Sequence, residues 1–157
     1  MLKIISGGQT GVDRAALDFA LTHGIHCGGY CPKGRKSEDG TIPEKYPLTE
    51  TQSDNYPERT ELNVKTGDGT LILIAGDPDR GTQLTIDLCK RYNKPCLVID
   101  LNDEKDRVDI KLWIEKNKIG TMNIAGNRES ISPGIQEKAY RFLLMIFVAT
   151  DYTYLHR

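Results

Sequence analysis

Short apolar runs alternate along the chain with segments whose apolar residues recur at helical spacing. This pattern predicts strands at 2–6, 26–31, 71–75, 96–101 and 121–125. It predicts helices at 11–23, 82–92 and 104–118, and a last helix that opens with Ser132 as its cap and Pro133 in its first turn. The alternation is typical of a Rossmann-like α/β fold, a three-layer α/β/α sandwich with a mainly parallel sheet of about five strands.

One segment departs from this alternation. Residues 32–57 hold four of the seven prolines and show no clear period. A segment of this length without regular structure is usually functional, so we interpret it as a long loop or lid. A tolerated surface insertion is the alternative.

The last helix is also unusual. Phe142–Ala149 is apolar on every side, whereas a helix on the surface of a domain needs only one apolar stripe. The second apolar face favours a homo-oligomer formed through this helix, with burial beneath the C-terminal tail as the alternative.

Composition narrows the class of protein. A chain of 157 residues has the size of one domain, so we expect a single domain over 1–157. Its 21 basic and 22 acidic residues lack the basic excess of most nucleic-acid binders, and we expect no nucleic-acid partner. The longest apolar run is far shorter than the ~20 residues that span a bilayer. With no signal-peptide pattern at the N-terminus, we expect a cytoplasmic protein without a membrane partner.

The four cysteines are expected to be reduced in that compartment. Cys27 and Cys31 are spaced C-x3-C, but no second Cys/His pair completes a zinc site. We therefore expect no protein-bound metal and interpret the cysteines as small buried apolar residues.

Candidate chemistry gathers in loops that follow predicted strands, where open parallel sheets bind ligands. The first loop is Ser6-Gly7-Gly8-Gln9-Thr10-Gly11, with Asp13 and Arg14 in the helix behind it. Its glycines would let backbone N–H groups approach an anion, and the helix N-terminus would add partial positive charge. The loop is neither a Walker A loop nor G-x-G-x-x-G, and such turns also occur for packing alone.

Two further loops lie at the same predicted edge. One carries Arg80-Gly81-Thr82, in which Arg80 can pair with phosphate and its neighbours supply backbone and hydroxyl donors. Alternatively, Asp77 or Asp79 caps the next helix while Arg80 is solvated. The other loop is Gly126-Asn127-Arg128-Glu129-Ser130. Together the loops predict a site for a phosphate-bearing, nucleotide-like ligand.

The long segment adds Lys33, Arg35, Glu38 and Asp39. These charges fit a lid that closes over a polyanion, or equally a solvated charged run.

These residues together resemble the molybdenum cofactor carrier protein family, in a larger Rossmann-like group related to LONELY GUY and the DNA-processing protein DprA. The matching positions run in order along nearly the whole chain: Ser6–Ala15, Cys31–Arg35, Glu38–Gly40, Arg59-Thr60, Asn63, Asp68–Thr70, Arg80–Thr82 and Ile124–Ser130. Asn127 stands where this family leads us to expect proline, and we expect a looser turn there without loss of the site.

The resemblance implies a carrier that binds the molybdenum cofactor, a pterin bearing a phosphate, and shields it until delivery. The cofactor's own dithiolene would hold the molybdenum, so protein ligands to the metal are not required. A nucleotide-sensing module that signals through its oligomer is also compatible with the apolar last helix.

A rival hypothesis is a phosphoribohydrolase of the LONELY GUY type. Its motif, Pro-Gly-Gly-x-Gly-Thr-x-x-Glu, aligned on Gly81-Thr82, places Thr85 at the glutamate position. Threonine cannot act as a carboxylate base, which argues against this chemistry. Other carboxylates could act instead, namely Asp13, Glu38, Asp39 or Glu129, so no catalytic residue is assigned.

Overall fold

The computed structural model describes residues 1–103 and 108–149 and contains a parallel sheet of five strands. The strands are β1 (Lys3–Ile5), β2 (Cys27–Gly28), β7 (Gly69–Ile74), β8 (Cys96–Asp100) and β9 (Thr121–Gly126). They lie in the order β2-β1-β9-β7-β8, and every neighbouring pair is parallel. The predicted parallel sheet is therefore confirmed.

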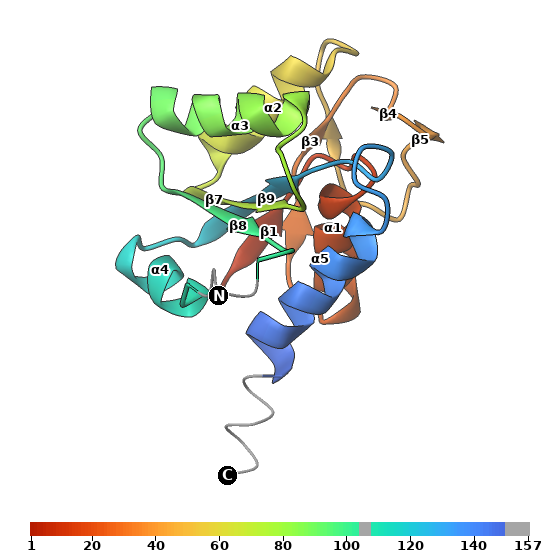
Figure 1. Ribbon diagram of the computed structural model, residues 1–157. Helices are drawn as coiled ribbons and strands as arrows, with labels where there is room; N and C mark the ends of the chain where they lie inside the picture. The colour runs from red at the N-terminus through yellow and green to blue at the C-terminus, as the bar shows by residue number, and fades with distance from the viewer. Residues whose placement is uncertain (104–107, 150–157) are drawn as a thin grey trace.

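Helices cover both faces of this sheet. Helices α1 (Val12–Thr22), α4 (Ile110–Lys116) and α5 (Ile135–Leu144) lie on one face, and α2 (Tyr56–Thr66) and α3 (Arg80–Arg91) lie on the other (Figure 1). A short π-helix, Met145–Ala149, continues α5. The predicted Rossmann-like three-layer architecture is confirmed.

The order of the strands creates a site at one edge of the sheet. From β1 the chain moves outward to β2, whereas from β7 it moves in the opposite direction to β8. Strand β9 lies between these two halves, so the carboxyl ends of β1, β9 and β7 adjoin one another. Open α/β sheets bind ligands at such a switch point.

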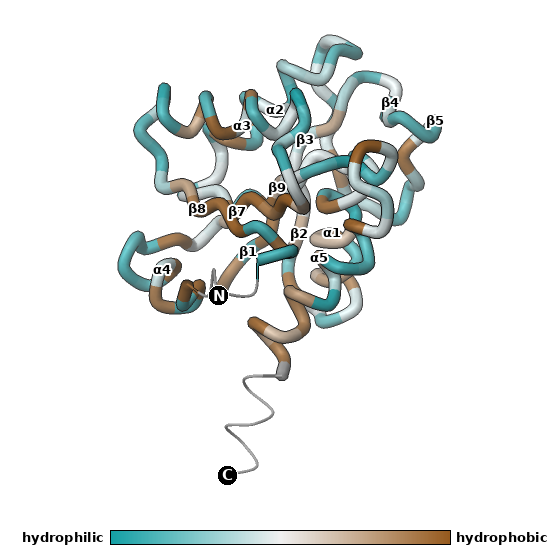
Figure 2. Tube along the Cα trace, in the orientation of Figure 1, coloured by the Kyte–Doolittle hydropathy of each residue, from teal (hydrophilic) through white to brown (hydrophobic). Residues whose placement is uncertain are grey.

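The hydrophobic core is densest around β7. All six residues of this strand are buried, and Figure 2 shows the hydrophobic stretch of β7 beside those of β8 and β9. On the α1 side, the Phe19 ring meets the edge of Tyr140, with 6.1 Å between ring centroids, and lies 5.9 Å from Phe147. The strands that hold the candidate loops are thus fixed from both faces.

The predicted strand at 26–31 is wrong as one continuous element. It breaks at Gly29 (φ 127°), where a Cβ would lie 2.1 Å from the carbonyl oxygen of Ser6. After this close contact the chain leaves the main sheet as β3 (Tyr30–Cys31), which pairs with β6 (Thr49–Glu50). The predicted long loop also contains a small hairpin of β4 (Lys36–Ser37) and β5 (Gly40–Thr41).

Helix boundaries account for the other corrections. Helix α2 was not predicted, although Asn55 caps it by accepting the N–H of Glu58 at 3.2 Å. Helix α4 begins only at Ile110, because Asp109 caps it; residues 104–107 of the predicted helix lie outside the described residues. The last helix begins at Ile135 behind Gly134 in the left-handed conformation, so the predicted start at Ser132-Pro133 is wrong.

Cys27, Cys31 and Cys89 are buried and Cys96 is half-buried, and all four are free thiols. Within residues 1–103 and 108–149, no helix has the length and apolar character that a membrane crossing requires.

Candidate functional site

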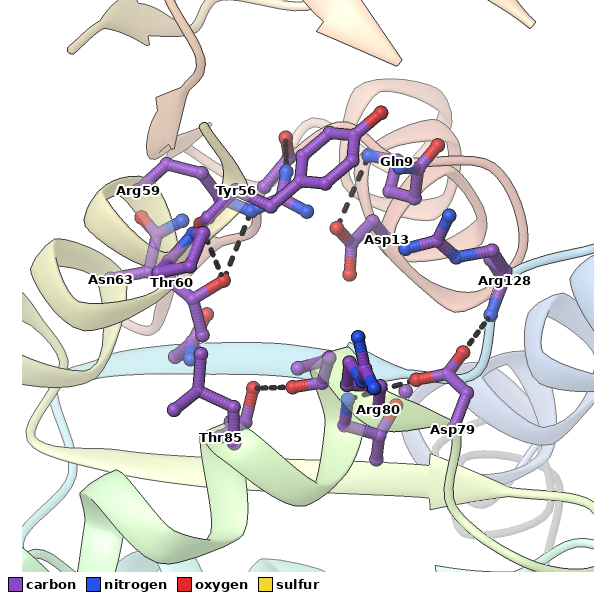
Figure 3. A pocket seen from close by; sticks show the side chains of 18 residues that line it. Gln9, Asp13, Tyr56, Arg59, Thr60, Asn63, Asp79, Arg80, Thr85 and Arg128 are labelled. Carbon is purple, nitrogen blue, oxygen red and sulfur yellow. Dashed lines mark hydrogen bonds between the residues drawn. The ribbon is translucent and has the colours of Figure 1, made fainter. Parts of the chain in front are cut away.

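A cavity of about 310 Å³ lies at the carboxyl ends of the strands, between α2 and α3. Its volume is at the lower end of the range for small-molecule sites. Figure 3 shows residues of α2 facing residues of α3 across it. It is lined by Gly7, Gln9, Asp13, Tyr56, Pro57, Arg59, Thr60, Asn63, Asp79, Arg80, Gly81, Thr82, Leu84, Thr85, Asn123, Ala125, Gly126 and Arg128.

The glycine-rich turn after β1 uses its backbone N–H groups inside the protein. Four consecutive N–H groups donate to protein acceptors at 3.1–3.3 Å: Gln9 to Asp13 Oδ2, Thr10 to Gln9 Oε1, Gly11 to Gln136 Oε1, and Val12 to the Asn127 carbonyl. An anion at the N-terminus of α1 would have to displace these acceptors. The turn therefore contributes its side chains to the cavity more readily than its backbone.

Two glycines of this turn have different roles. Gly11 has φ 85°, and a Cβ there would lie 2.3 Å from the carbonyl oxygen of Asn127, so its role is packing against the loop after β9. Gly7 lies on the cavity wall, where a Cβ would be 2.8 Å from Arg59 Nη1 and 2.9 Å from Asp13 Oδ2. A side chain at position 7 would displace one of these charged groups.

The N-terminus of α3 forms another wall. Asp79 caps this helix by accepting the N–H of Thr82 at 2.8 Å, and its second oxygen accepts the N–H of Arg128 at 2.9 Å. Arg80, the first residue of the helix, is exposed and lines the cavity. Asp79 thus caps the helix, as one alternative predicted, and Arg80 is nevertheless positioned to contact an anion in the cavity.

Asn127 does not loosen its turn as expected. It is fully buried, and its side-chain nitrogen donates to the Asp77 carbonyl at 3.0 Å and to Ser132 Oγ at 2.9 Å. Its side-chain oxygen accepts the N–H of Asp79 at 3.1 Å. One amide therefore joins the loop after β9 to the loop after β7 and fixes the position of the α3 cap.

Two buried polar atoms of the cavity wall have no partner among the described residues: Gln9 Nε2 and Thr82 Oγ1. Gln9 is 5% exposed and Thr82 is 2% exposed. The orientation of the Gln9 amide is fixed, because its oxygen accepts the N–H groups of Thr10 (3.1 Å) and Glu38 (2.9 Å). Buried donors are usually satisfied, so these two indicate acceptors supplied by a ligand.

A buried carboxylate and a buried guanidinium face each other around Gly7. Burial raises the pKa of Asp13 above its ordinary value, although the charge of Arg59 acts in the opposite direction. Burial lowers the pKa of Arg59, and the charge of Asp13 opposes that shift. Perturbed ionisable groups in a cavity are typical of functional sites.

The segment predicted as a lid is fastened to the body beside the cavity. Glu38 accepts hydrogen bonds from the Thr10 hydroxyl and from Ser130 Oγ (2.5 Å), and it pairs with Arg128 at 3.7 Å. Burial acts to raise the pKa of Glu38, but the hydrogen bonds from Ser130 and Thr10 hold it below its ordinary value. Asp39 pairs with Arg14 at 2.5 Å, which together with Ser37 lowers the pKa of Asp39 to about 2.

Lys33 and Arg35, the two basic residues predicted to belong to the lid, do not line the cavity. Lys33 is exposed. The Arg35 guanidinium donates to three carbonyl oxygens of its own segment, those of Ile42, Pro43 and Tyr46, at 2.7–3.1 Å. Arg35 thus folds the segment on itself.

The predicted site residues divide into two groups. Those that line the cavity are Gly7, Gln9, Asp13, Arg80, Gly81, Thr82, Gly126 and Arg128. Those outside its lining are Ser6, Gly8, Thr10, Gly11, Arg14, Asn127, Glu129 and Ser130, with Lys33, Arg35, Glu38 and Asp39. Members of the second group make structural contacts. For example, Ser6 Oγ donates to the Ile124 carbonyl at 2.6 Å, and Glu129 accepts the N–H of Gly134 at 2.7 Å.

Sequence reasoning named Arg59, Thr60 and Asn63 only as positions of the family resemblance. It did not assign the α2 wall of the cavity, which also includes Tyr56 and Pro57. The available signals were Asn55 followed by Pro57, a cap residue and a first-turn proline. Arg59 and Asn63 are four residues apart, a spacing that places them on one face of a helix.

The geometry can be compared with known proteins. A model of the circularly permuted YpsA SLOG family matches residues 4–147. The crystal structure of a protein named "Putative molybdenum carrier protein", from Syntrophus aciditrophicus SB, is similar with a TM-score of 0.88 and 44% identity. The similarity covers 94% of this chain and 95% of that one. No curated protein sequence matches significantly. The family match extends over nearly the whole fold and its cavity, and the chain belongs to the circularly permuted YpsA SLOG family.

Proposed function

We propose that the cavity binds a phosphate-bearing ligand of nucleotide or pterin type, and that the protein carries or stores the molybdenum cofactor. The observation that carries this proposal is the pair of unpartnered buried donors, Gln9 Nε2 and Thr82 Oγ1, in the residues that line one cavity. An unsatisfied buried donor costs about 1–3 kcal/mol, and a ligand acceptor would remove that cost.

The phosphate is proposed to bind at the N-terminus of α3. Arg80 lies at the start of this helix, Thr82 supplies the unpartnered hydroxyl, and Arg128 lies beside them on the cavity wall. A helix N-terminus favours an anion, but Asp79 already accepts the Thr82 N–H here, so side chains would provide most of the contacts. The N-terminus of α1 is less suitable, because its N–H groups have acceptors and the nearby Arg14 is already paired with Asp39.

The molybdenum cofactor is compatible with the donors of the cavity. Its phosphate and the acceptor atoms of its pterin would meet Arg80, Thr82 and Gln9. Within the described residues, no group of three or more His, Cys, Asp or Glu residues is placed to hold a metal ion. Molybdenum would thus travel as part of the cargo, held by the dithiolene. The name of the Syntrophus protein supports this cargo.

A nucleotide-processing enzyme is the second candidate. In its favour, Asp13 is a buried carboxylate on the cavity wall, of the kind that serves as a general acid or base. Against it, Thr85 occupies the position of the hydrolase glutamate, and its hydroxyl donates to the Gly81 carbonyl of its own helix at 3.0 Å. An N-glycosidase would release free base from nucleoside monophosphates, and a panel of these substrates tests for it.

The assembly is proposed to be a cytoplasmic homo-oligomer that binds a small molecule and no nucleic acid. The end of the last helix supports the oligomer, because Met145 is 47% exposed and Ile146 is only half-buried. The alternative cover, the C-terminal tail, lies outside the described residues. A monomeric mass in solution, measured by light scattering, would remove the oligomer from the proposal.

The proposal is tested by calorimetry and thermal shift with molybdopterin-type cofactor and pterin phosphates. Arg80→Ala and Arg128→Ala should each weaken binding by about 1.5–3 kcal/mol, the range for charged hydrogen bonds. Arg141→Ala is the matched control, because this exposed arginine on α5 pairs only with Glu137 among the described residues. If none of these ligands binds, or if both site variants bind as well as wild type, the proposed function fails.

A further inference from the structure

Arg59 is a buried cation without an ion pair. The residue is 7% exposed, and its guanidinium donates to two neutral acceptors, the Gly7 carbonyl at 2.8 Å and Thr60 Oγ1 at 3.1 Å. Within residues 1–103 and 108–149, no carboxylate forms an ion pair with Arg59. Arginine is rarely buried unless it is paired, and an unpaired buried charge is costly. The buried Asp13 carboxylate acts on Arg59 through its charge but forms no ion pair with it. Because Arg59 lines the cavity, a ligand can supply a directly bound anion.

Further positive charge gathers beside Arg59. Arg59, Arg128 and Lys36 all lie around the ring of Tyr56, with the guanidinium carbons 5.1 and 5.4 Å and the ammonium nitrogen 5.3 Å from the ring centroid. The ring attracts each cation, but the cations repel one another. Glu38 pairs with Arg128 at 3.7 Å. Arg59 also lines the cavity, but no described carboxylate forms an ion pair with it.

Within this group, Arg59 is separate from the proposed phosphate position, whereas Arg128 lies near both. Figure 3 shows Arg59 and Tyr56 on one side of the cavity and Arg80 on the opposite side. The first two belong to α2 and Arg80 to α3, so two different helices present positive charge to the same cavity. A ligand with a single phosphate at α3 would leave Arg59 buried and unpaired.

We propose that Arg59 forms a second anion subsite, and that the ligand is a diphosphate rather than a monophosphate. This inference rests on the proposed function and names its ligand class: one phosphate binds at Arg80 and Thr82, and the second binds at Arg59 beside Tyr56. Arg128, which lies near both groups, contacts the bridge between them. A nucleoside diphosphate or a pyrophosphate-linked dinucleotide form of a pterin has this chemistry.

The test compares inorganic phosphate with pyrophosphate by calorimetry on the full chain. Wild type should bind pyrophosphate at least about tenfold more tightly than phosphate, the factor expected for one added charged contact. Arg59→Gln should lower pyrophosphate affinity by about tenfold and leave phosphate affinity within about twofold. Arg80→Gln should lower both affinities, and Arg141→Gln should change neither.

Arg59→Lys provides a second variant if Arg59→Gln does not fold, because it keeps the charge and loses the fork of donors. It should also reduce the preference for pyrophosphate. Equal binding of phosphate and pyrophosphate by wild type, or equal losses for both ligands in the Arg59 variants, would overturn the second subsite and leave the proposed function standing. Absence of binding by both anions and by pterin phosphates would instead count against the proposed function itself.

Discussion

The Arg14 guanidinium and the Asp39 carboxylate form a two-pronged ion pair, with nitrogen–oxygen distances of 2.5 and 2.7 Å. Arg14 belongs to α1, and Asp39 lies between the strands of the β4–β5 hairpin. Arg14 also donates to Ser37 Oγ at 2.9 Å and, through Nε, to the Gly8 carbonyl at 3.1 Å. One arginine thus joins the hairpin to the glycine-rich turn, and the hairpin is held in place before any ligand arrives.

Asp39→Asn should destabilise the protein in a pH-dependent manner. The pKa of Asp39 is lowered from 3.8 to about 2, so its ionised form stabilises the fold above pH ~4. This contribution is lost as the pH falls through the folded value. Since the Asp39 side chain is 49% exposed, we expect a loss of only about 1 kcal/mol at pH 7. Urea unfolding at several pH values measures it.

The control for that experiment is Glu137→Gln, which removes the exposed pair with Arg141 on α5. Its effect should stay within about 0.5 kcal/mol. A deficit in Asp39→Asn that is the same at pH 7 and pH 3 would show that the ion pair is not its cause.

Asp13→Asn should change the stability of the protein in the opposite direction to Asp39→Asn at neutral pH. Burial raises the pKa of Asp13, so the protonated carboxyl favours folding below pH ~3.8, and this contribution is lost as the pH rises through the folded value. The amide of the variant has no such loss. We expect the variant to be at least as stable as wild type at pH 7, with its advantage shrinking towards pH 4. A constant deficit at both pH values would contradict this assignment.

The fold was predictable where burial follows chain-local patterns. β7 was located because all six of its residues are buried, and its central residues form a continuous apolar run. Helix α2 was missed for the converse reason. Its buried residues are Arg59, Thr60, Asn63 and Val64, so the side that faces the cavity is polar. A helix that directs polar groups inward lacks the apolar stripe that sequence reasoning detects.

The site was predictable to a similar degree. The three loops were located because parallel strands present their carboxyl ends together. The acceptors that bind the N–H groups of the glycine-rich turn could not be predicted, because several of them lie far away in the sequence. Gln136 accepts the N–H of Gly11 from 125 residues along the chain, and the contact of Gly29 with Ser6 that breaks the second strand is also non-local. Local sequence patterns do not indicate contacts between residues that are far apart in the chain.

Gly11→Ala should destabilise the protein more than Gly24→Ala. Both glycines have positive φ, 85° and 67°, so each substitution carries backbone strain of about 1 kcal/mol. Only at Gly11 would the new Cβ meet backbone, at 2.3 Å from the Asn127 carbonyl oxygen, whereas nothing lies within 4 Å at Gly24. The extra loss should exceed about 1 kcal/mol. Equal urea midpoints and slopes for the two variants would show that α1 does not depend on this close approach.

Thr82→Val should raise stability and weaken ligand binding in the same molecule. The Thr82 hydroxyl is buried without a partner among the described residues, so its replacement by a methyl group should stabilise the free protein by about 1 kcal/mol. If that hydroxyl contacts the ligand, affinity for phosphate should fall by about tenfold. Thr85→Val is the matched control, because the Thr85 hydroxyl already donates to the Gly81 carbonyl at 3.0 Å. It should lower stability slightly and leave affinity unchanged. A Thr82→Val variant that loses stability and keeps full affinity would show that this hydroxyl serves the fold, and that the phosphate position at α3 must be sought elsewhere.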